Sequence, residues 1–143
     1  MTLRTATEKD IPFLSCGKDY GFSDCWTEKM TKDGFNDNLL KGIIAEEDAR
    51  PAGFITYEES LDFWDIEILF VLPEYRKKGV GGKLIERLLS LAKEKGIEKV
   101  FLEVKKTNAE AVSLYGKYSF KKISERKNYY PDGETALVMV KEL

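Results

Sequence analysis

The sequence contains no histidine and only two cysteines, Cys16 and Cys25, among its 143 residues. These absences exclude a zinc site built from Cys and His ligands and a catalytic triad that depends on histidine, and we predict no metal site. Neither cysteine has a histidine to activate it, so a covalent route through cysteine is not expected. Any chemistry must therefore use carboxylates, hydroxyls, tyrosines, lysines or backbone amides.

The sequence also lacks a long apolar run and an excess of charge of one sign. The longest apolar run, residues 68–72, is far shorter than the ~20 residues that cross a bilayer, and residues 1–10 have no apolar core of a secretory signal. The 23 basic and 25 acidic residues give a net charge of −2, which argues against general nucleic-acid binding. We expect a cytoplasmic protein with reduced thiols and with neither a membrane nor a nucleic acid as partner.

The composition is that of a folded domain. Hydrophobic residues make up 43% of the chain and charged residues 34%, a mixture that can bury roughly two-thirds of the surface of the unfolded chain. The length is close to the typical size of one domain, about 150 residues. We therefore predict a single domain that spans residues 1–143.

The hydrophobic periodicity predicts seven strands and four helices. The expected strands cover residues 3–6, 42–46, 52–58, 61–72, 100–104, 121–130 and 135–140, and the expected helices cover 7–18, a segment after 27, 80–95 and 108–118. A helix connects 61–72 to 100–104, so these two strands are expected to be parallel neighbours. The other strands follow short turns, at 48–51 and 131–133, which indicates antiparallel pairing. The predicted fold class is α/β (α+β) with a mixed central sheet flanked by helices.

A glycine-rich basic turn lies between the strand over 61–72 and the helix over 80–95. It reads Arg76-Lys77-Lys78-Gly79-Val80-Gly81-Gly82-Lys83. Unpaired amides at a helix N-terminus, the helix dipole and three consecutive basic residues would attract a pyrophosphate. The spacing fits neither a P-loop nor a dinucleotide-binding motif. The alternative is a solvated basic turn with no ligand.

The same turn carries a family resemblance. The pattern Arg76-x-x-Gly79-x-Gly81 resembles the acetyl-coenzyme A motif of the GCN5-related N-acetyltransferases (GNAT superfamily). Later in the chain, the pattern Asn108-x-x-Ala111-x-x-Leu114-Tyr115, which ends at Phe120, resembles the second motif of that superfamily. The opening residues 3–7 with Asp10 resemble its first strand and helix, so the resemblance spans the whole chain.

The resemblance implies a fold with a parallel strand pair that splays apart, and acetyl-CoA as co-substrate without a metal. In this superfamily the splayed strand and the glycine turn bind the pantetheine arm and the pyrophosphate through their backbone. The cofactor-binding residues implied are Leu69, Phe70, Val71, Arg76, Lys77, Lys78, Gly79, Val80, Gly81, Gly82 and Asn108.

Glu103 is the candidate general base. On the strand over 100–104 it would lie among apolar residues, which raises the affinity of a carboxylate for protons unless it is paired. The alternative is a structural ion pair with Lys105 or Lys121. The Leu-Glu-Val motif of the family favours the base. Glu67, in the adjacent strand, is the second candidate, and its alternation places it on the face of Leu69 and Val71.

Tyr115 is the candidate general acid. Its helical spacing is equally typical of core packing, but the resemblance implies that its phenol protonates the departing coenzyme A thiolate. Asn108 could act as a helix N-cap, as a cofactor contact, or as both. Ser119 stands where the family usually has glycine, which puts the left-handed ending of this helix in doubt.

Two further motifs resemble one branch of the family, the bacterial ribosomal-protein-alanine N-acetyltransferases, which acetylate protein N-termini. They are residues 102–104 and 128–131, the second of which contains Tyr129 and Tyr130. The resemblance makes Glu67, Tyr129 and Tyr130 candidate acceptor-binding residues. From composition alone, Tyr20, Phe22 and Trp26 are candidates to line the other side of the groove.

The implied reaction is direct transfer of acetyl from acetyl-CoA to a primary amine. An α-amino group has a pKa of about 7.7–8.0 and a lysine about 10.4, so a lysine needs roughly 3.5 kcal/mol more to lose its proton at neutral pH. A glutamate base therefore suits the N-terminal α-amine of a protein or peptide. The alternatives are a small-molecule amine N-acetyltransferase and a non-catalytic acetyl-CoA-binding module.

Overall fold

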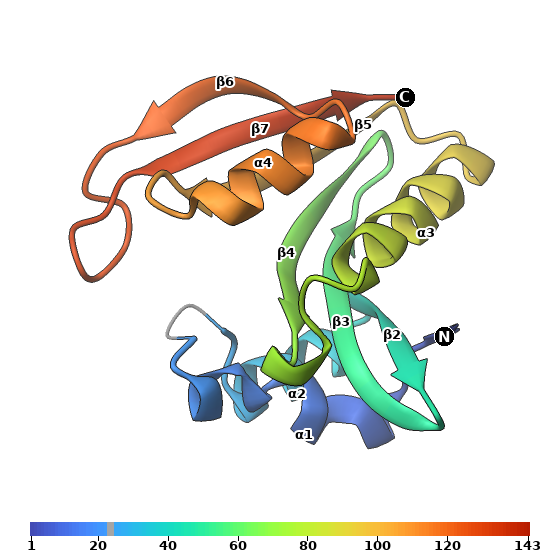
Figure 1. Cartoon of the computed structure of the whole chain (residues 1–143). Helices are drawn as coiled ribbons and strands as arrows, with labels where there is room; N and C mark the ends of the chain where they lie inside the picture. The colour runs from blue at the N-terminus through green and yellow to red at the C-terminus, as the bar shows by residue number, and fades with distance from the viewer. Residues whose placement is uncertain (23–24) are drawn as a thin grey trace.

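Alternating apolar residues build one seven-stranded sheet, with helices packed on both of its faces (Figure 1). The computed structural model describes residues 1–22 and 25–143. The strands are β1 (Thr2–Thr5), β2 (Leu40–Glu47), β3 (Arg50–Glu59), β4 (Phe63–Val71), β5 (Lys99–Lys105), β6 (Lys121–Arg126) and β7 (Ala136–Glu142). The helices are α1 (Ile11–Leu14), α2 (Glu28–Asn36), α3 (Val80–Glu94) and α4 (Ala109–Lys117), with 3₁₀ turns η1 (Glu8–Asp10), η2 (Cys16–Tyr20) and η3 (Pro73–Tyr75).

The strand order is β1-β2-β3-β4-β5-β7-β6. Every neighbouring pair is antiparallel except β4 and β5, which run parallel and are joined through α3. The predicted α/β class, the mixed sheet and its one parallel junction are therefore confirmed.

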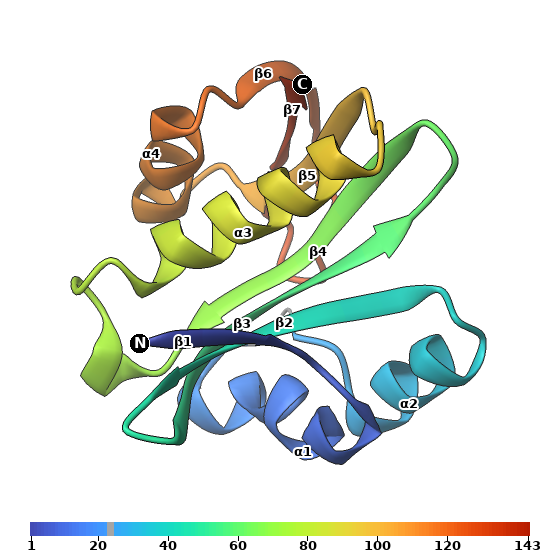
Figure 2. The same cartoon turned by 90° about the vertical axis from the view of Figure 1, so that its right-hand side faces the viewer.

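The sheet separates two hydrophobic cores, and each core is covered by different helices (Figure 2). On one face α3 contributes Leu84, Ile85 and Leu88, all fully buried, and α4 contributes Tyr115. On the other face Leu14 of α1 and Phe35 of α2 pack against the first half of the sheet. Within the described residues no helix combines the length and the apolar character that a membrane span requires.

The prediction of one continuous helix over residues 7–18 is wrong. Thr7 and Asp10 do cap its start, since the Thr7 amide donates to the Asp10 carboxylate over 2.7 Å. The segment then divides into η1, α1 and η2. Ser15 ends α1, where its hydroxyl donates to the Ile11 carbonyl over 2.8 Å and so competes with the helical ladder.

The last hairpin is also shorter than expected. β6 ends at Arg126 instead of continuing to residue 130. Asn128 has a positive φ of 52°, which breaks the extended backbone, and the amides of Tyr129 and Tyr130 both donate to the Glu134 carbonyl. The two tyrosines therefore lie on the connection between β6 and β7, which we call the aromatic arm.

The parallel pair opens partway along its length. β4 and β5 are paired from Phe63 opposite Lys99 to Ile66 opposite Leu102, and no pair follows. Beyond that point β4 stays paired with β3, down to Val71 opposite Gly53. The splay implied by the family resemblance is present, and it creates a gap in the middle of the sheet.

The substitution of serine for glycine at the end of α4 does not disturb the helix ending. Ser119 has a φ of 69°, the left-handed conformation that glycine usually supplies. The amide of Ser119 donates to the Gly116 carbonyl, and that of Phe120 donates to the Tyr115 carbonyl. The fold tolerates the strain of a serine in the left-handed conformation, and the Phe120 side chain is still buried in the core.

Candidate active site

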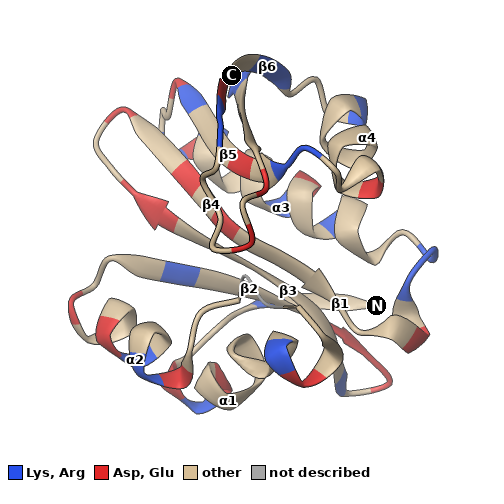
Figure 3. Ribbon diagram, turned by 90° about the vertical axis from the view of Figure 1, so that its left-hand side faces the viewer, with Lys and Arg blue, Asp and Glu red and all other residues tan. Residues whose placement is uncertain are grey.

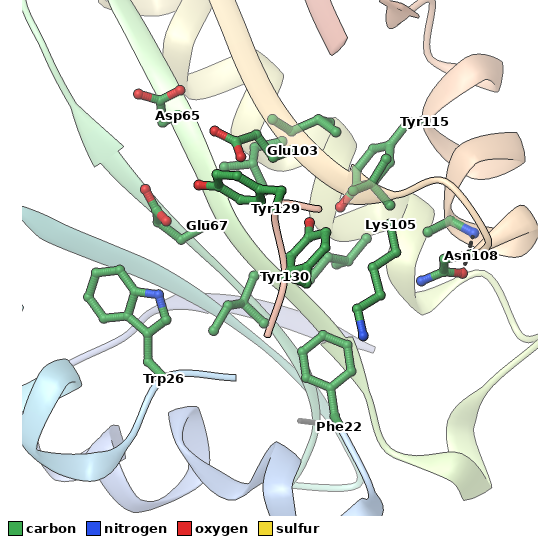
Figure 4. Close-up of a pocket in the computed structure, with 16 residues that line it drawn as sticks. Phe22, Trp26, Asp65, Glu67, Glu103, Lys105, Asn108, Tyr115, Tyr129 and Tyr130 are labelled. Atoms are coloured by element: carbon green, nitrogen blue, oxygen red, sulfur yellow. Dashed lines mark hydrogen bonds between the residues drawn. The ribbon is translucent and has the colours of Figure 1, made fainter. Parts of the chain in front are cut away.

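A cleft of about 450 Å³ occupies the gap between the splayed strands (Figure 4). Its walls come from β4, β5, the start of α4, the aromatic arm, and the residues Phe22 and Trp26. The lining residues are Phe22, Trp26, Asp65, Ile66, Glu67, Ile68, Leu69, Leu102, Glu103, Val104, Lys105, Asn108, Ala111, Tyr115, Tyr129 and Tyr130. The cleft thus joins both predicted catalytic residues and all three predicted acceptor-binding residues.

A β-bulge in β4 places Leu69 and Val71 on the opposite face of the sheet from Glu67. Tyr57 of β3 lies opposite Ile66 and Thr56 lies opposite Ile68, so Glu67 is the extra residue. The alternation reverses there, because Ile66 packs in the α3 core whereas Ile68 packs in the α1 and α2 core. Glu67 therefore shares the α1 and α2 face with Asp65. The prediction that it lies on the face of Leu69 and Val71 is wrong, because simple alternation does not hold across a bulge.

The Glu67 carboxylate is held in its neutral form more strongly than an ordinary glutamate. Burial raises its pKa to about 7, and the nearby carboxylates of Glu58, Asp65 and Glu103 add to the rise. Burial and the charge of Glu103 also raise the pKa of Asp65. One end of the cleft is therefore acidic and contains a group that exchanges a proton near neutral pH.

Glu103 projects from β5 toward the same end of the cleft (Figure 4). Its Oε2 atom is buried and has no hydrogen-bond partner among the described residues. Its Oε1 atom lies 3.9 Å from Nη1 of Arg126, so the alternative interpretation, an ion pair with Lys105 or Lys121, is wrong. An unsatisfied buried carboxylate oxygen is costly, and it is available to accept a hydrogen bond from a ligand in the cleft.

Tyr115 lies on the α4 side of the cleft. Its ring packs edge-on against Phe120, with 5.6 Å between ring centroids. Burial raises the pKa of its hydroxyl well above the usual range, and Tyr130 adds to the rise. The phenol therefore stays protonated at neutral pH. Asn108 caps the same helix, because its Oδ1 atom accepts from the Ala111 amide over 3.1 Å, and it also lines the cleft.

Aromatic side chains line opposite sides of the cleft. Tyr129 and Tyr130 of the aromatic arm face Phe22 and Trp26 across it (Figure 4). Phe22 and Trp26 line the same cleft as Tyr129 and Tyr130, and their contact with an acceptor peptide stays a prediction. Tyr20 does not line it and packs instead on the Phe70 ring, at 5.8 Å between centroids.

The glycine turn lies beyond the end of β4 and outside the walls of this cleft. None of the backbone amides of residues 77–82 donates to a backbone carbonyl, in a segment that the structure describes completely. Gly79 has a φ of 83°, and a Cβ atom there would meet nothing within 4 Å. The basic residues that precede α3 lie together at this end of the helix (Figure 3). The turn therefore has amides without a backbone partner, and its basic residues 76–78 are exposed.

Several predicted cofactor-binding residues make structural contacts. The Nε atom of Arg76 donates to the Val71 carbonyl over 2.9 Å, and its guanidinium lies 5.6 Å from the centroid of the Phe70 ring. The Phe70 side chain is buried in the α1 and α2 core. Of the strand residues 69–71, only Leu69 lines the cleft. Gly82 permits close contact with α4, because a Cβ atom there would lie 2.5 Å from the Tyr118 hydroxyl.

The sequence-based prediction missed two charged residues of the cleft, Asp65 and Lys105. Each is two positions from a predicted site residue on the same strand, Asp65 from Glu67 and Lys105 from Glu103. The period of two along a strand would have placed Lys105 on the face of Glu103. The bulge does not affect Asp65 and Glu67, since both precede the reversal.

Known proteins resemble the chain over nearly its whole length. The model of the Acetyltransferase (GNAT) family matches residues 7–120. The ribosomal protein bS18-alanine N-acetyltransferase of Escherichia coli strain K12 is 31% identical over 141 residues, which cover 96% of this chain and 95% of that protein. An N-alpha-acetyltransferase of Saccharolobus solfataricus is 42% identical over 74 residues, 51% of this chain and 44% of that protein. The crystal structure of the Escherichia coli ribosomal-protein-S18-alanine N-acetyltransferase has a TM-score of 0.88 at 27% identity and covers 99% of this chain and 92% of that one.

Proposed function

The chain belongs to the acetyltransferase (GNAT) family, and from this premise we propose that it transfers the acetyl group of acetyl-CoA to the α-amino group of a protein N-terminus. The observation that carries the proposal is the gap past Ile66, where the parallel strands part and Glu67 and Glu103 face one cleft. Membership of the family supports acetyl-CoA as the acetyl donor, and the residues of the cleft support an amine as the acceptor.

The glycine turn fits the phosphates of acetyl-CoA. Six consecutive amides without a backbone partner, together with Lys77 and Lys78, offer hydrogen bonds and positive charge at the start of α3. Gly79 and Gly81 carry no side chain that would keep a phosphate from the backbone. The unpaired edge of β4 leads from this turn to the cleft. We assign the donor to Arg76, residues 77–82, the backbone of 69–71 and Asn108. When bound, acetyl-CoA supplies the activated acyl thioester.

The acidic end of the cleft fits the acceptor amine. Asp65, Glu67 and Glu103 bring three carboxylates to one place, which attracts an ammonium group. The pKa of Glu67, about 7, lies within about one unit of an α-ammonium and more than three units below a lysine. Proton transfer is efficient when the two pKa values are close. This matching supports an α-amine as the acceptor.

We assign the proton-accepting role to the carboxylate pair. Glu67 is the base, because it can hold or release a proton near neutral pH, and Glu103 accepts a hydrogen bond from the amine through its free Oε2 atom. Glu103 remains the alternative base that the family motif implies. Tyr115, protonated at neutral pH, donates a proton to the departing thiolate. Tyr129 and Tyr130 border the acceptor peptide.

The relatives support a protein acceptor. The Escherichia coli relative is named for acetylating an alanine of ribosomal protein bS18, and the Saccharolobus relative is named an N-alpha-acetyltransferase. We propose a protein N-terminus as the acceptor of this chain also. A ribosomal acceptor would place the reaction in the cytoplasm.

The test is release of free thiol from acetyl-CoA in the presence of a panel of acceptors. The panel contains peptides with a free N-terminus, the same peptides with a blocked N-terminus and an internal lysine, polyamines and free amino acids. We expect thiol release with the free-N-terminus peptides alone. Turnover with a polyamine or amino acid while every peptide is inert would favour the small-molecule amine reaction.

A further inference from the structure

Lys105 lines the cleft but has no role in the chemistry derived above. Its Nζ atom lies 2.6 Å from Oδ2 of Asp132 and 5.3 Å from the centroid of the Tyr130 ring. Lys105 is on β5, whereas Asp132 and Tyr130 are both on the connection between β6 and β7. One ammonium group therefore ties the wall of the cleft to the aromatic arm.

We propose that the ion pair of Lys105 with Asp132 positions the aromatic arm over the cleft and so sets the affinity for the acceptor peptide. The inference rests on the proposed function, because it assumes that the acceptor lies beneath Tyr129 and Tyr130. Lys105 is then a positioning residue, since it acts through the arm.

The connection has its own internal structure, so a single anchor can hold it. The Gly133 amide donates to the Tyr130 carbonyl over 2.8 Å, and the Glu134 amide donates to Oδ1 of Asp132 over 3.0 Å. These bonds make the turn at residues 130–134 a compact unit. Oδ2 of the same carboxylate forms the ion pair with Lys105. Asp132 therefore joins this unit to β5.

The position of the aromatic arm also affects the surroundings of Glu103 in the cleft. The Tyr129 and Tyr130 rings pack edge to face, with centroids 5.2 Å apart. Tyr129 and Glu103 line the same cleft, and the nearby Glu103 carboxylate is the largest cause of the raised pKa of the Tyr129 hydroxyl. A displaced Tyr130 would therefore also move Tyr129 away from Glu103.

Charge is the part of the anchor that can be removed without changing its shape. Asp132→Asn keeps Oδ1 as an acceptor for the Glu134 amide but replaces the carboxylate oxygen beside Lys105 with an NH₂ group. Asp132 is absent from the cleft lining, and its side chain is 49% exposed. An effect of this variant on the acceptor must therefore pass through Lys105 and the arm.

The experiment measures steady-state kinetics with an N-terminal peptide and acetyl-CoA for three variants. We expect Asp132→Asn to raise the acceptor KM about fivefold and Lys105→Met about tenfold, equal to about 1.4 kcal/mol for the second. The kcat and the KM for acetyl-CoA should stay within twofold of the parent. Lys105→Arg keeps the cation and should restore the acceptor KM.

A matched control comes from the neighbouring ion pair. Lys106 lies 2.9 Å from Glu125 of β6, and neither residue lines the cleft. Glu125 also lies 2.9 Å from Nζ of Lys122, so Glu125→Gln removes two ion pairs, one with Lys106 just after β5 and one with Lys122 in β6. This variant should leave the acceptor KM unchanged.

Limited trypsin digestion measures how well the aromatic arm is held in place when no acceptor is present. We expect cleavage after Lys127, followed by mass spectrometry, to be faster in Asp132→Asn than in the parent or in Glu125→Gln.

A parental acceptor KM together with a parental rate of cleavage in Asp132→Asn would overturn the proposal. So would a raised KM in Lys105→Met with a parental KM in Asp132→Asn, because the lysine would then bind the acceptor directly. A parent protein inert toward every peptide would instead refute the proposed function, and cleavage after Lys127 would still decide whether the pair anchors the arm.

Discussion

Glu67 owes its raised pKa to its position in β4. Its side chain shares the α1 and α2 face with Asp65, just before the bulge reverses the alternation, and it lies across the cleft from Glu103. Burial and these neighbours disfavour the ionised form. A carboxylate that is buried and surrounded by other carboxylates is poorly suited to stability, but it is suited to proton exchange near neutral pH.

The pH dependence of turnover separates the two candidate bases. A base must be deprotonated, so kcat/KM should rise about tenfold per pH unit below a pKa of about 7 and level off above it. We expect Glu67→Gln to abolish this acidic limb and Glu103→Gln to lower the rate but keep the limb. A limb that survives in Glu67→Gln and disappears in Glu103→Gln would assign the base to Glu103, as the family motif implies.

A variant of Tyr115 tests whether this residue protonates the departing thiolate. Tyr115→Phe removes only the hydroxyl and keeps the ring that packs on Phe120, so the fold should be retained. We expect kcat to fall by about 100-fold, at the lower end of the range for loss of a general acid. Binding of acetyl-CoA, measured by calorimetry, should be unchanged. A kcat within threefold of the parent would exclude Tyr115 as the proton donor.

At the level of elements, the two ends of α3 have matched glycines with different roles. Gly79 precedes the helix with a φ of 83°, and Gly96 follows it with a φ of 73°; a Cβ atom at either would meet nothing within 4 Å. Alanine at each position should cost about 1–2 kcal/mol in unfolding free energy, because a left-handed L-residue is strained.

Only the N-terminal end should affect the donor. We expect Gly79→Ala to raise the KM for acetyl-CoA at least fivefold, since it disturbs the free amides, and Gly96→Ala to leave that KM unchanged. Thermal melting of both variants controls for stability. Equal KM values in the two variants would argue against donor binding at the glycine turn.

The sequence could predict the elements whose patterns are local. The period of α3 and the glycine that follows its end depend on residues close in the chain. The parallel pairing of β4 with β5 follows from the helix that connects them. The positions of Glu103, Tyr115 and the arm in one cleft came from the family resemblance. The bulge at Glu67 could not be predicted, because it depends on the register with β3. The end of β6 was missed because Asn128 adopts a positive φ that the β-like residues around it do not indicate.

At the scale of the whole molecule, the site should reduce stability. The pKa of Glu67 is raised from 4.5 to about 7 in the folded protein, so the folded state binds more protons than the unfolded state between these values. Stability should therefore fall as pH rises through this window. Solvent at the partly exposed carboxylate reduces the effect, and we expect Glu67→Gln to be about 2 kcal/mol more stable than the parent at pH 8.

Urea unfolding of both proteins at pH 4 and pH 8 measures this difference. The gain should be present at pH 8 and absent at pH 4, where Glu67 is protonated in the folded protein. Equal stability of the two proteins at pH 8 would contradict the raised pKa.

In the proposed reaction, donor and acceptor would reach the cleft from different sides. The basic turn lies at the start of α3, which packs on one face of the sheet, whereas Glu67 and Glu103 lie toward the α1 and α2 face. Opposite charges on the two sides favour an anionic donor on one and a cationic acceptor on the other. Both substrates can then be present at once, as direct transfer requires.

The most direct measurement locates the transferred group. The protein is incubated with isotopically labelled acetyl-CoA and a peptide that has both a free N-terminus and one internal lysine, and fragmentation mass spectrometry identifies the labelled nitrogen. We predict label on the α-nitrogen alone, with loss of labelling in the double variant Glu67→Gln/Glu103→Gln. Label on the lysine side chain, or labelling that persists in the double variant, would contradict the account.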